Sequence, residues 1–317
     1  MQYSQFYNDP LYINPALAGA GKVNRAGLHF RDQWPGIKES YKTYSAFVDR
    51  YSPAIKSGFG LMVVQDIAGT GALTYTGVAM NYSYLLVLDY SNTLRLGLKA
   101  EIGNRRIDFS KLLFADQVIR DRAPNSLDEF ENNVVYYPNT AFGFEWSNSK
   151  LNLRFGAAID HLNSPDQSFT SQPNKMPLLF STYVLHNFYL NRSQRLRREQ
   201  YFKAGAYYKF EEKWDQLEIG TNYHHKNVEI GLWFRGLPAL KSYKPGYSNT
   251  EAVIIYLGLQ YNGIHFGYNY DATISRLLIN NSKGSHELTI VYGFSDPKKK
   301  KKRRMIPCSD LMGNSLR

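Results

Sequence analysis

The side chains that could carry out chemistry, histidine above all, are dispersed along the 317-residue chain. Of the seven histidines only His224 and His225 are neighbours, and adjacent residues of a strand point to opposite faces, so the pair is poorly placed to share a metal ion. The single cysteine, Cys308, cannot form a disulfide within the chain or a cysteine-based metal site. There is no complete nucleotide-binding fingerprint, P-loop or Gly-x-Ser-x-Gly elbow. The sequence therefore predicts no enzyme, no metal site and no cofactor.

The composition favours a membrane protein built from strands. Tyr (25), Phe (18) and Trp (4) make up 15% of the chain, and tyrosine suits a membrane interface because its ring is buried while its hydroxyl stays hydrated. The mean hydropathy is negative, and no stretch approaches the roughly 18 consecutive apolar residues of a helical span. A low average does not exclude a transmembrane barrel, because only every second residue of its strands faces lipid.

Apolar and polar residues alternate with a period of two in many segments. One such segment places Leu94, Leu96, Leu98, Ala100 and Ile102 on one face and Arg95, Gly97, Lys99, Glu101 and Gly103 on the other. The same alternation begins again at Leu151, Val228 and Ile264. These patterns predict strands with one apolar and one polar face.

Together these segments predict an all-β fold, a single transmembrane antiparallel β-barrel of about 14 strands. The expected strands are 23–32, 42–52, 57–67, 72–86, 92–104, 138–148, 150–161, 179–190, 199–211, 214–224, 226–236, 251–261, 263–271 and 285–294. Most are long enough for a tilted strand to cross a bilayer core, and bacterial single-chain barrels have an even number of strands. We expect an N-terminal periplasmic, plug-like segment at 1–22, the barrel at 23–295 and a basic C-terminal periplasmic tail at 296–317.

The connections between these strands alternate in length. With the N-terminal side in the periplasm, the even connections are short turns, whereas most odd, extracellular ones are long; only 68–71 and 212–213 are short among them. Short periplasmic turns and longer extracellular loops are typical of outer-membrane barrels. The longest loop, 105–137, is expected to be functional or disordered. It can fold inward as a plug or outward as a lid, and residues 110–122 could form a short helix within it.

The formal net charge of +11 is concentrated near the C-terminus. The basic run consists of Lys298, Lys299, Lys300, Lys301, Lys302, Arg303 and Arg304. Such a run repels itself and does not fold alone. It is either a solubilising tail attracted to outer-membrane lipid headgroups or a tether to a periplasmic partner. A nucleic-acid-binding surface would spread basic residues over one face among aromatic residues, so we expect no nucleic acid partner.

Charged side chains also recur on the polar faces of the predicted strands. They are Arg25, Arg31, Arg95, Lys99, Glu101, Arg154, Asp160, Lys203, Lys209, Glu218, Glu229 and Arg235. In a barrel of this size the lumen could be wide enough for a pore. The charges fit two states of it: a closed lumen crossed by ion pairs, or an open conductive one.

The N-terminal residues resemble those of a known family. Residues 2–19 are QYSQFYNDPLYINPALAG, and residues 31–36 are RDQWPG. The order and spacing resemble the PorP/SprF family of Bacteroidetes outer-membrane proteins, and the resemblance continues through most of the chain up to Asp296. It implies a role in type IX secretion and gliding, in which members hold secreted proteins with a type B C-terminal domain at the cell surface. It also implies contact with a periplasmic peptidoglycan-binding or ring component.

Two segments are candidates for partner contact. Asn14 and Pro15 are expected in a turn or short helical corner, which either seals the barrel mouth as a plug or contacts a partner directly. Trp34, Pro35 and Gly36 are expected in an extracellular turn, where Trp34 either anchors the barrel among lipid headgroups or contacts the exported cargo. We predict a non-enzymatic outer-membrane barrel, exported through a signal peptide that this chain does not show, which anchors a secreted protein. The alternative is a porin-like diffusion channel for small solutes.

Overall fold

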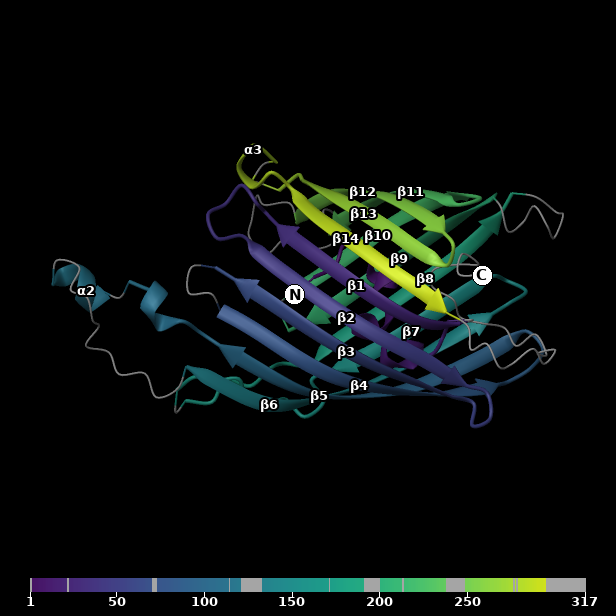
Figure 1. The fold of residues 1–317 in the computed structure, drawn as a ribbon, viewed down its shortest axis with the longest axis horizontal. Coiled ribbons are helices and arrows are strands. Elements are labelled where there is room, and N and C mark those ends of the chain that lie inside the picture. The colour runs from purple at the N-terminus through teal and green to yellow at the C-terminus, as the bar shows by residue number, and fades with distance from the viewer. Residues whose placement is uncertain are drawn as a thin grey trace.

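The computed structural model shows a closed sheet in which every strand pairs antiparallel with its neighbours along the chain and β1 pairs with β14 (Figure 1). The structure describes residues 2–21, 23–69, 73–113, 115–120, 133–170, 172–190, 200–212, 214–237, 249–275, 277 and 279–294. The predicted all-β, 14-stranded barrel is therefore confirmed. Closure leaves no unpaired edge strand, as a barrel in lipid requires.

All of the expected strands are present, with bounds that differ by a few residues. They are β1 (Asn24–Gln33), β2 (Tyr41–Ser52), β3 (Ser57–Ala68), β4 (Leu73–Val87), β5 (Asn92–Arg106), β6 (Val134–Asn148), β7 (Leu153–Asp160), β8 (Leu179–Tyr189), β9 (Gln200–Glu211), β10 (Trp214–His225), β11 (Val228–Gly236), β12 (Thr250–Tyr261), β13 (Ile264–Thr273) and β14 (Ser285–Phe294). The largest difference is the start of β6, because its pairing with β5 continues to Arg106 and Val134.

The helices are short. They are η1 (Phe6–Asn8), α1 (Pro10–Ile13), η2 (Pro15–Leu17), η3 (Phe109–Lys111), α2 (Ala115–Ile119) and α3 (Ile279–Ser282). Pro10 and Pro15 stand at the first positions of α1 and η2, where the missing N–H of proline is not needed. Among the residues that the structure describes, no helix is long and apolar enough to cross a membrane.

The alternation of the sequence becomes the two faces of the barrel wall. On β5, Leu98 and Ile102 face outward and are 56% and 65% exposed, whereas Arg95 is buried on the lumen side. Trp233 of β11 also faces the lumen, as its place among the polar residues of that strand predicted, and it is buried. An apolar outer face and a polar inner face are what a barrel in lipid needs.

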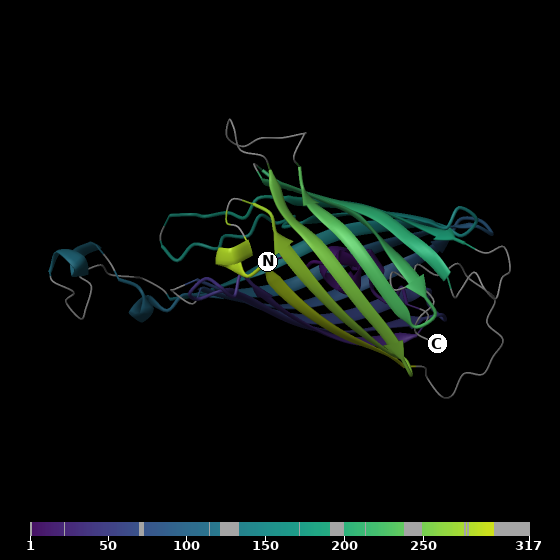
Figure 2. The ribbon, with the colours of Figure 1, turned by 90° about the horizontal axis from the view of Figure 1, so that it is seen from above.

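The two ends of the barrel differ. Short turns join the strands at one end, and one of them, Asn262-Gly263, has both residues at positive φ, as a tight hairpin turn prefers. The longer connections gather at the other end, from which η3 and α2 project away from the barrel (Figure 1, Figure 2). Within the predicted loop 105–137, η3 and α2 therefore lie outside the lumen. By the rule for bacterial barrels, the long-loop end is extracellular and the short-turn end periplasmic.

The N-terminal segment occupies the inside of the barrel (Figure 2). Gln2 Nε2 donates to Glu251 Oε1 at 3.0 Å, near the start of β12 at the long-loop end. Gly19 N donates to Asp49 Oδ2 at 2.7 Å, near the short-turn end of β2. We call residues 2–21 the plug. The segment that we expected on the periplasmic side thus runs through the lumen, because its apolar side chains, such as the fully buried Leu11, pack against the inner wall.

Candidate functional site

Glycines in the barrel wall make room for the backbone of the plug. A Cβ atom at Gly97 of β5 would lie 2.1 Å from the backbone nitrogen of Ala16, and one at Gly58 of β3 would lie 1.9 Å from the carbonyl oxygen of Ala18. Real Cβ atoms essentially never approach other heavy atoms this closely. The wall is therefore shaped to hold this segment in contact, as glycines in strands often allow.

Asn14 and Pro15, two of the predicted partner residues, lie where the plug packs against this wall. Asn14 is fully buried and accepts a hydrogen bond from Ala16 N at 2.9 Å, which caps η2. Its Nδ2 donates to the carbonyl oxygens of Phe144 and Ala157 on β6 and β7, at 2.8 and 3.2 Å. Pro15, the first residue of η2, is buried as well. In this structure both residues fasten the plug to the wall, and neither presents a surface to a partner outside the barrel.

Asp9 is a buried carboxyl group of the plug. Ser45 Oγ donates to Asp9 Oδ2 at 2.9 Å, and His29 Nε2 lies 4.0 Å from the same oxygen. Burial raises the pKa of Asp9 to about 7, against the smaller opposing effects of its hydrogen bonds and of Arg25. Near neutral pH the carboxyl group is therefore partly protonated.

Ion pairs between neighbouring and next-but-one strands line the inner wall beside the plug. Arg235 lies 2.7 Å from Glu218 and 2.9 Å from Asp271, and Arg31 lies 2.8 Å from Asp271 and 3.3 Å from Glu287. All five side chains are at most 2% exposed. Other buried pairs are Arg25 with Asp49, Lys203 with Glu229 and Lys99 with Glu101. Of the two lumen states that the sequence left open, the described residues form the closed one, but the plug fills it and the ion pairs run along the inner wall instead of across the interior.

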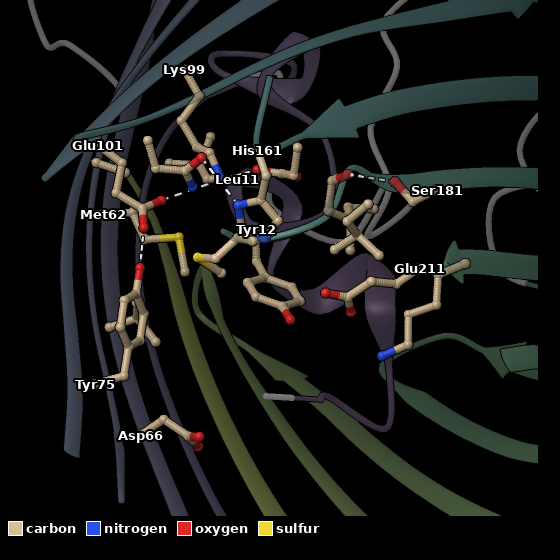
Figure 3. A pocket seen from close by; sticks show the side chains of 18 of the residues that line it. Leu11, Tyr12, Met62, Asp66, Tyr75, Lys99, Glu101, His161, Ser181 and Glu211 are labelled. Atoms are coloured by element: carbon tan, nitrogen blue, oxygen red, sulfur yellow. Dashed lines mark hydrogen bonds and ion pairs between the residues drawn. The ribbon is translucent and has the colours of Figure 1, made fainter. Parts of the chain in front are cut away.

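Above the plug, towards the long-loop end, an inner chamber of about 280 Å³ remains (Figure 3). Its floor is formed by residues 11–13 of the plug. On its wall Lys99 lies between Glu101, at 3.2 Å, and Asp160, and Tyr75 donates a hydrogen bond to Glu101. The wall therefore combines phenol groups with paired charges.

A second cavity of about 590 Å³ lies at the barrel mouth. It shares Asp66, Leu179, Lys209 and Glu211 with the inner chamber, so the two adjoin. Gln2, the first described residue of the plug, also lines the mouth cavity. We call the two cavities together the vestibule. It opens towards the long loops and ends at the plug.

Trp34, another predicted partner residue, lines the mouth cavity. Its φ of 61° lies in the left-handed region, which is uncommon for a bulky residue. Its backbone N–H donates to Gly284 O at 3.0 Å, and its ring packs edge-on against Tyr41 at a centroid distance of 5.8 Å. Pro35 and Gly36 are exposed in the same turn. Trp34 is thus held at the rim of the vestibule.

The turn is clamped in this position by the connection before β14. Gly36 N donates to Ser282 O at 3.0 Å, and a Cβ atom at Gly36 would lie 2.3 Å from Asn281 O. Only glycine allows this close approach of the two backbones. The sequence placed this turn at the extracellular end but gave no sign of its contact with residues 281–284.

The remaining predicted site residues lie outside the described residues. They are Lys298, Lys299, Lys300, Lys301, Lys302, Arg303 and Arg304. Within the described ranges, no group of His, Cys, Asp or Glu side chains is arranged to hold a metal ion. Asp66, Glu211 and Trp214 were not predicted as site residues. The alternation gave their faces, but no local signal indicates that β3, β9 and β10 contribute to one cavity.

The sequence matches the model of a known family. Residues 1–292 match the family described as "Type IX secretion system membrane protein PorP/SprF". A comparison with curated proteins gives no match.

The fold resembles solved outer-membrane proteins at low sequence identity. The Pseudomonas putida toluene transporter TodX is 11% identical with a TM-score of 0.51, over 91% of this chain and 94% of that chain. The Acinetobacter baumannii outer membrane protein Omp33 is 9% identical with a TM-score of 0.46, over 87% of this chain and 100% of that one. CdiB from the same species is 8% identical with a TM-score of 0.45, over 86% and 60%. At these identities the likeness concerns the barrel fold alone.

Proposed function

Because the chain belongs to the PorP/SprF family of type IX secretion system membrane proteins, we propose that it anchors a secreted protein at the cell surface through the vestibule at its extracellular end. The observation that carries this proposal is the plugged lumen, which leaves a cavity open towards the outside and closed below. Such a cavity suits a partner that is held, because nothing passes beyond its floor. The partner would be a secreted protein with a type B C-terminal domain, for example a gliding adhesin.

The plug argues against the alternative of a porin-like channel. Porins conduct through a water-filled lumen, whereas here the plug side chains Phe6, Tyr7 and Leu17 are at most 2% exposed and pack against the inner wall. The buried side chains of Arg31 and Arg235 also take up space in the lumen beside the plug. We therefore expect little or no conductance from the intact protein in planar bilayers.

The proposal includes a connection to the periplasm. β14 ends at Phe294 at the short-turn end, so the chain leaves the barrel on that side. The basic run 298–304 and the apolar residues of 305–312 follow this exit in the sequence. A peptidoglycan-binding or secretion-ring component in the periplasm is the partner that this tail would tether.

The test is a gentle detergent pull-down of the affinity-tagged full chain from native outer membranes with active secretion. Bound proteins are identified by mass spectrometry, and an unrelated barrel from the same membranes carrying the same tag is the control. We expect a large secreted protein that ends in a β-rich C-terminal domain, together with a periplasmic peptidoglycan-binding protein. Recovery of the barrel alone, combined with stable conductance in planar bilayers, would instead support the solute channel.

A further inference from the structure

The vestibule has the composition of a protein-binding surface. Interface cores are enriched in tyrosine, tryptophan, methionine and arginine, and binding energy concentrates on such residues. The lining residues of these types are Tyr12, Trp34, Tyr41, Met62, Tyr75, Arg105, Tyr137, Met176, Tyr207 and Trp214. Trp214 is 73% exposed at the rim, so one large aromatic side chain already faces the outside.

The excess of carboxylates in the vestibule favours an occupant with a positive charge. Its described lining carries the carboxylates of Asp66, Glu101, Asp160, Glu211, Asp215 and Glu251 but only the cations of Lys99, Arg105 and Lys209. Lys99 pairs with Glu101 and Asp160, and Arg235 lies 3.5 Å from Glu251. The carboxylate of Asp66 accepts a hydrogen bond from Thr43 at 2.5 Å but has no cation within 4.0 Å among the described residues, and Glu211 has none either.

A buried acceptor in the mouth cavity is available to a donor from an incoming group. Gln216 is 9% exposed, and its Nε2 donates to Glu251 Oε2 at 2.9 Å. Its Oε1 is buried and has no hydrogen-bond partner among the described residues. Buried polar atoms are rarely left unpaired. The mouth cavity therefore offers one buried amide oxygen and two carboxylates with no cation within 4.0 Å among the described residues to an incoming group that carries N–H bonds.

We propose that the vestibule receives an extended, positively charged peptide segment of the secreted partner, with one lysine or arginine side chain directed at Asp66 on one wall and another at Glu211 on the facing wall. This inference rests on the anchoring function proposed above and adds the chemistry of the bound segment. Asp66 and Glu211 line the chamber from β3 and β9, which lie almost opposite each other in the closed sheet, and Figure 3 shows Glu211 beside Tyr12 of the floor and Asp66 away from both. Complementary charge across an interface steers association and fixes register, and the aromatic lining supplies the apolar contact.

A peptide fits the size of the vestibule better than a folded domain. Cavities of about 300–1,000 Å³ hold ligands of the size of a few residues, and the two adjoining cavities measure about 280 and 590 Å³. A folded domain would remain above the mouth and insert only a strand end or a tail. A neutral glycan would also stack on tryptophan, but it would leave Asp66 and Glu211 without a cation.

The direct test measures peptide binding to the purified full chain in detergent by fluorescence anisotropy. The probes are labelled eight-residue peptides of alternating serine and lysine, or of alternating serine and glutamate, and a labelled isomaltohexaose. We expect the lysine peptide to bind in a salt-dependent manner and the double variant Asp66→Asn/Glu211→Gln to bind it about tenfold more weakly. Asp108→Asn and Asp116→Asn, which remove carboxylates from the projecting loop, should leave binding unchanged.

The proposal would be overturned if the unchanged protein bound the lysine and glutamate peptides equally well. It would also be overturned if the double variant bound the lysine peptide as tightly as the unchanged protein does. The third contrary outcome is that the protein prefers the sugar and that Trp34→Ala loses this sugar binding. The same double variant in the pull-down separates the two levels of inference. If the unchanged protein retains a secreted protein and the double variant retains it equally, the peptide site is wrong and the anchoring function stands. If the unchanged protein retains none, the anchoring function itself fails.

Discussion

Asn14 joins the plug to two strands through a single amide group. Asn14→Asp keeps the shape of the side chain but places a carboxylate oxygen against the carbonyl oxygens of Phe144 and Ala157, where Nδ2 now donates. We expect the free energy of unfolding in detergent to fall by about 3 kcal/mol, because a buried polar group loses its partners and gains a charge. Asn14→Ala, which adds no charge, should cost about 1–2 kcal/mol.

The control for Asn14 is a half-exposed asparagine outside the lumen. Asn148 Oδ1 accepts from Lys150 N and Leu151 N at 3.0 and 2.8 Å, and a carboxylate can do the same. Its Nδ2 donates to Asn92 Oδ1 at 2.8 Å, and because this contact is only partly buried, Asn148→Asp should change the free energy of unfolding by no more than about 1 kcal/mol. Similar losses for Asn14→Asp and Asn148→Asp would show that the plug is not held at this point.

A single methyl group added at Gly97 should displace the plug from the barrel wall. Gly97→Ala brings a Cβ atom to 2.1 Å from the Ala16 nitrogen, a backbone atom that cannot turn aside. We expect a loss of about 1–3 kcal/mol in the free energy of unfolding, together with conductance in planar bilayers that the unchanged protein lacks. In the control Gly267→Ala the nearest atoms are side-chain atoms of Tyr256 at 3.2 Å, which can shift. If Gly97→Ala changed neither the stability nor the conductance, the plug would not be held in contact with the wall at Gly97.

Asp9 should make the stability of the plugged barrel depend on pH. Its pKa is about 7 in the folded protein against an ordinary value of 3.8. Because the folded state holds the proton more tightly, this contribution is present below about pH 4 and is lost as pH rises through 7, at up to about 1.4 kcal/mol per pH unit. Asp9→Asn should remove this slope, so the difference in unfolding free energy between variant and unchanged protein should grow from pH 4 to 7.

The matched measurement for Asp9 uses an exposed carboxylate. Asp108 lies on the projecting loop, where its carboxylate contacts Ser110 and Lys111 outside the barrel. The unfolding free energy of the Asp108→Asn variant should follow that of the unchanged protein at every pH from 4 to 9. Parallel curves for Asp9→Asn and the unchanged protein would contradict a protonated, buried Asp9.

Among the elements, β11 carries the cation on which the lumen network depends. Arg235→Met fills a similar volume but leaves Glu218 without its partner at 2.7 Å, and Asp271 keeps only Arg31. Removing one partner of a buried ion pair costs about 3–5 kcal/mol, so we expect a loss of this size in the free energy of unfolding.

An exposed ion pair is the comparison for this network. Lys111 lies 3.6 Å from Asp108, and the two side chains are 56% and 38% exposed. Lys111→Met should change the unfolding free energy by no more than about 1 kcal/mol. If Arg235→Met is equally mild, water or relaxation in the lumen compensates the charges, and the network does not hold the strands together.

The strands were predictable from the sequence because their signal is local. In 228–236 the alternation assigns each residue to a face by its position, so Trp233 shares the polar face of Glu229 and Arg235, and the structure places Ile230 outward and Trp233 inward accordingly. The position of the plug was not predictable in the same way. Ser4 N donates to Glu287 Oε2 across 283 positions of the chain, and no periodicity encodes such a contact. The same holds for the vestibule, where Asp66 and Glu211 line one cavity only because the barrel closes.

At the scale of the molecule, the plug fills the lumen and separates the extracellular end of the barrel from its periplasmic end. The extracellular end keeps the vestibule, whose floor is the α1 region of the plug. The periplasmic end receives the last turn of the same segment, where Gly19 contacts Asp49 and Leu17 O accepts from Arg25. Because one continuous segment fills the lumen between the two ends, the anchoring function proposed above needs no passage for solutes.

The tail prediction tests the periplasmic side of this arrangement. Deleting residues 298–317 should leave the barrel folded, because β14 ends at Phe294 and already pairs with β1 and β13. We expect the truncated chain to retain the secreted protein in the pull-down but to lose most of the periplasmic partner. A second variant that replaces the seven basic residues of 298–304 by serine separates the effect of charge from that of the apolar residues of 305–312. Retention by the serine variant with loss in the deletion would assign the contact to 305–317, whereas full recovery of every partner by the truncated chain would contradict the tether.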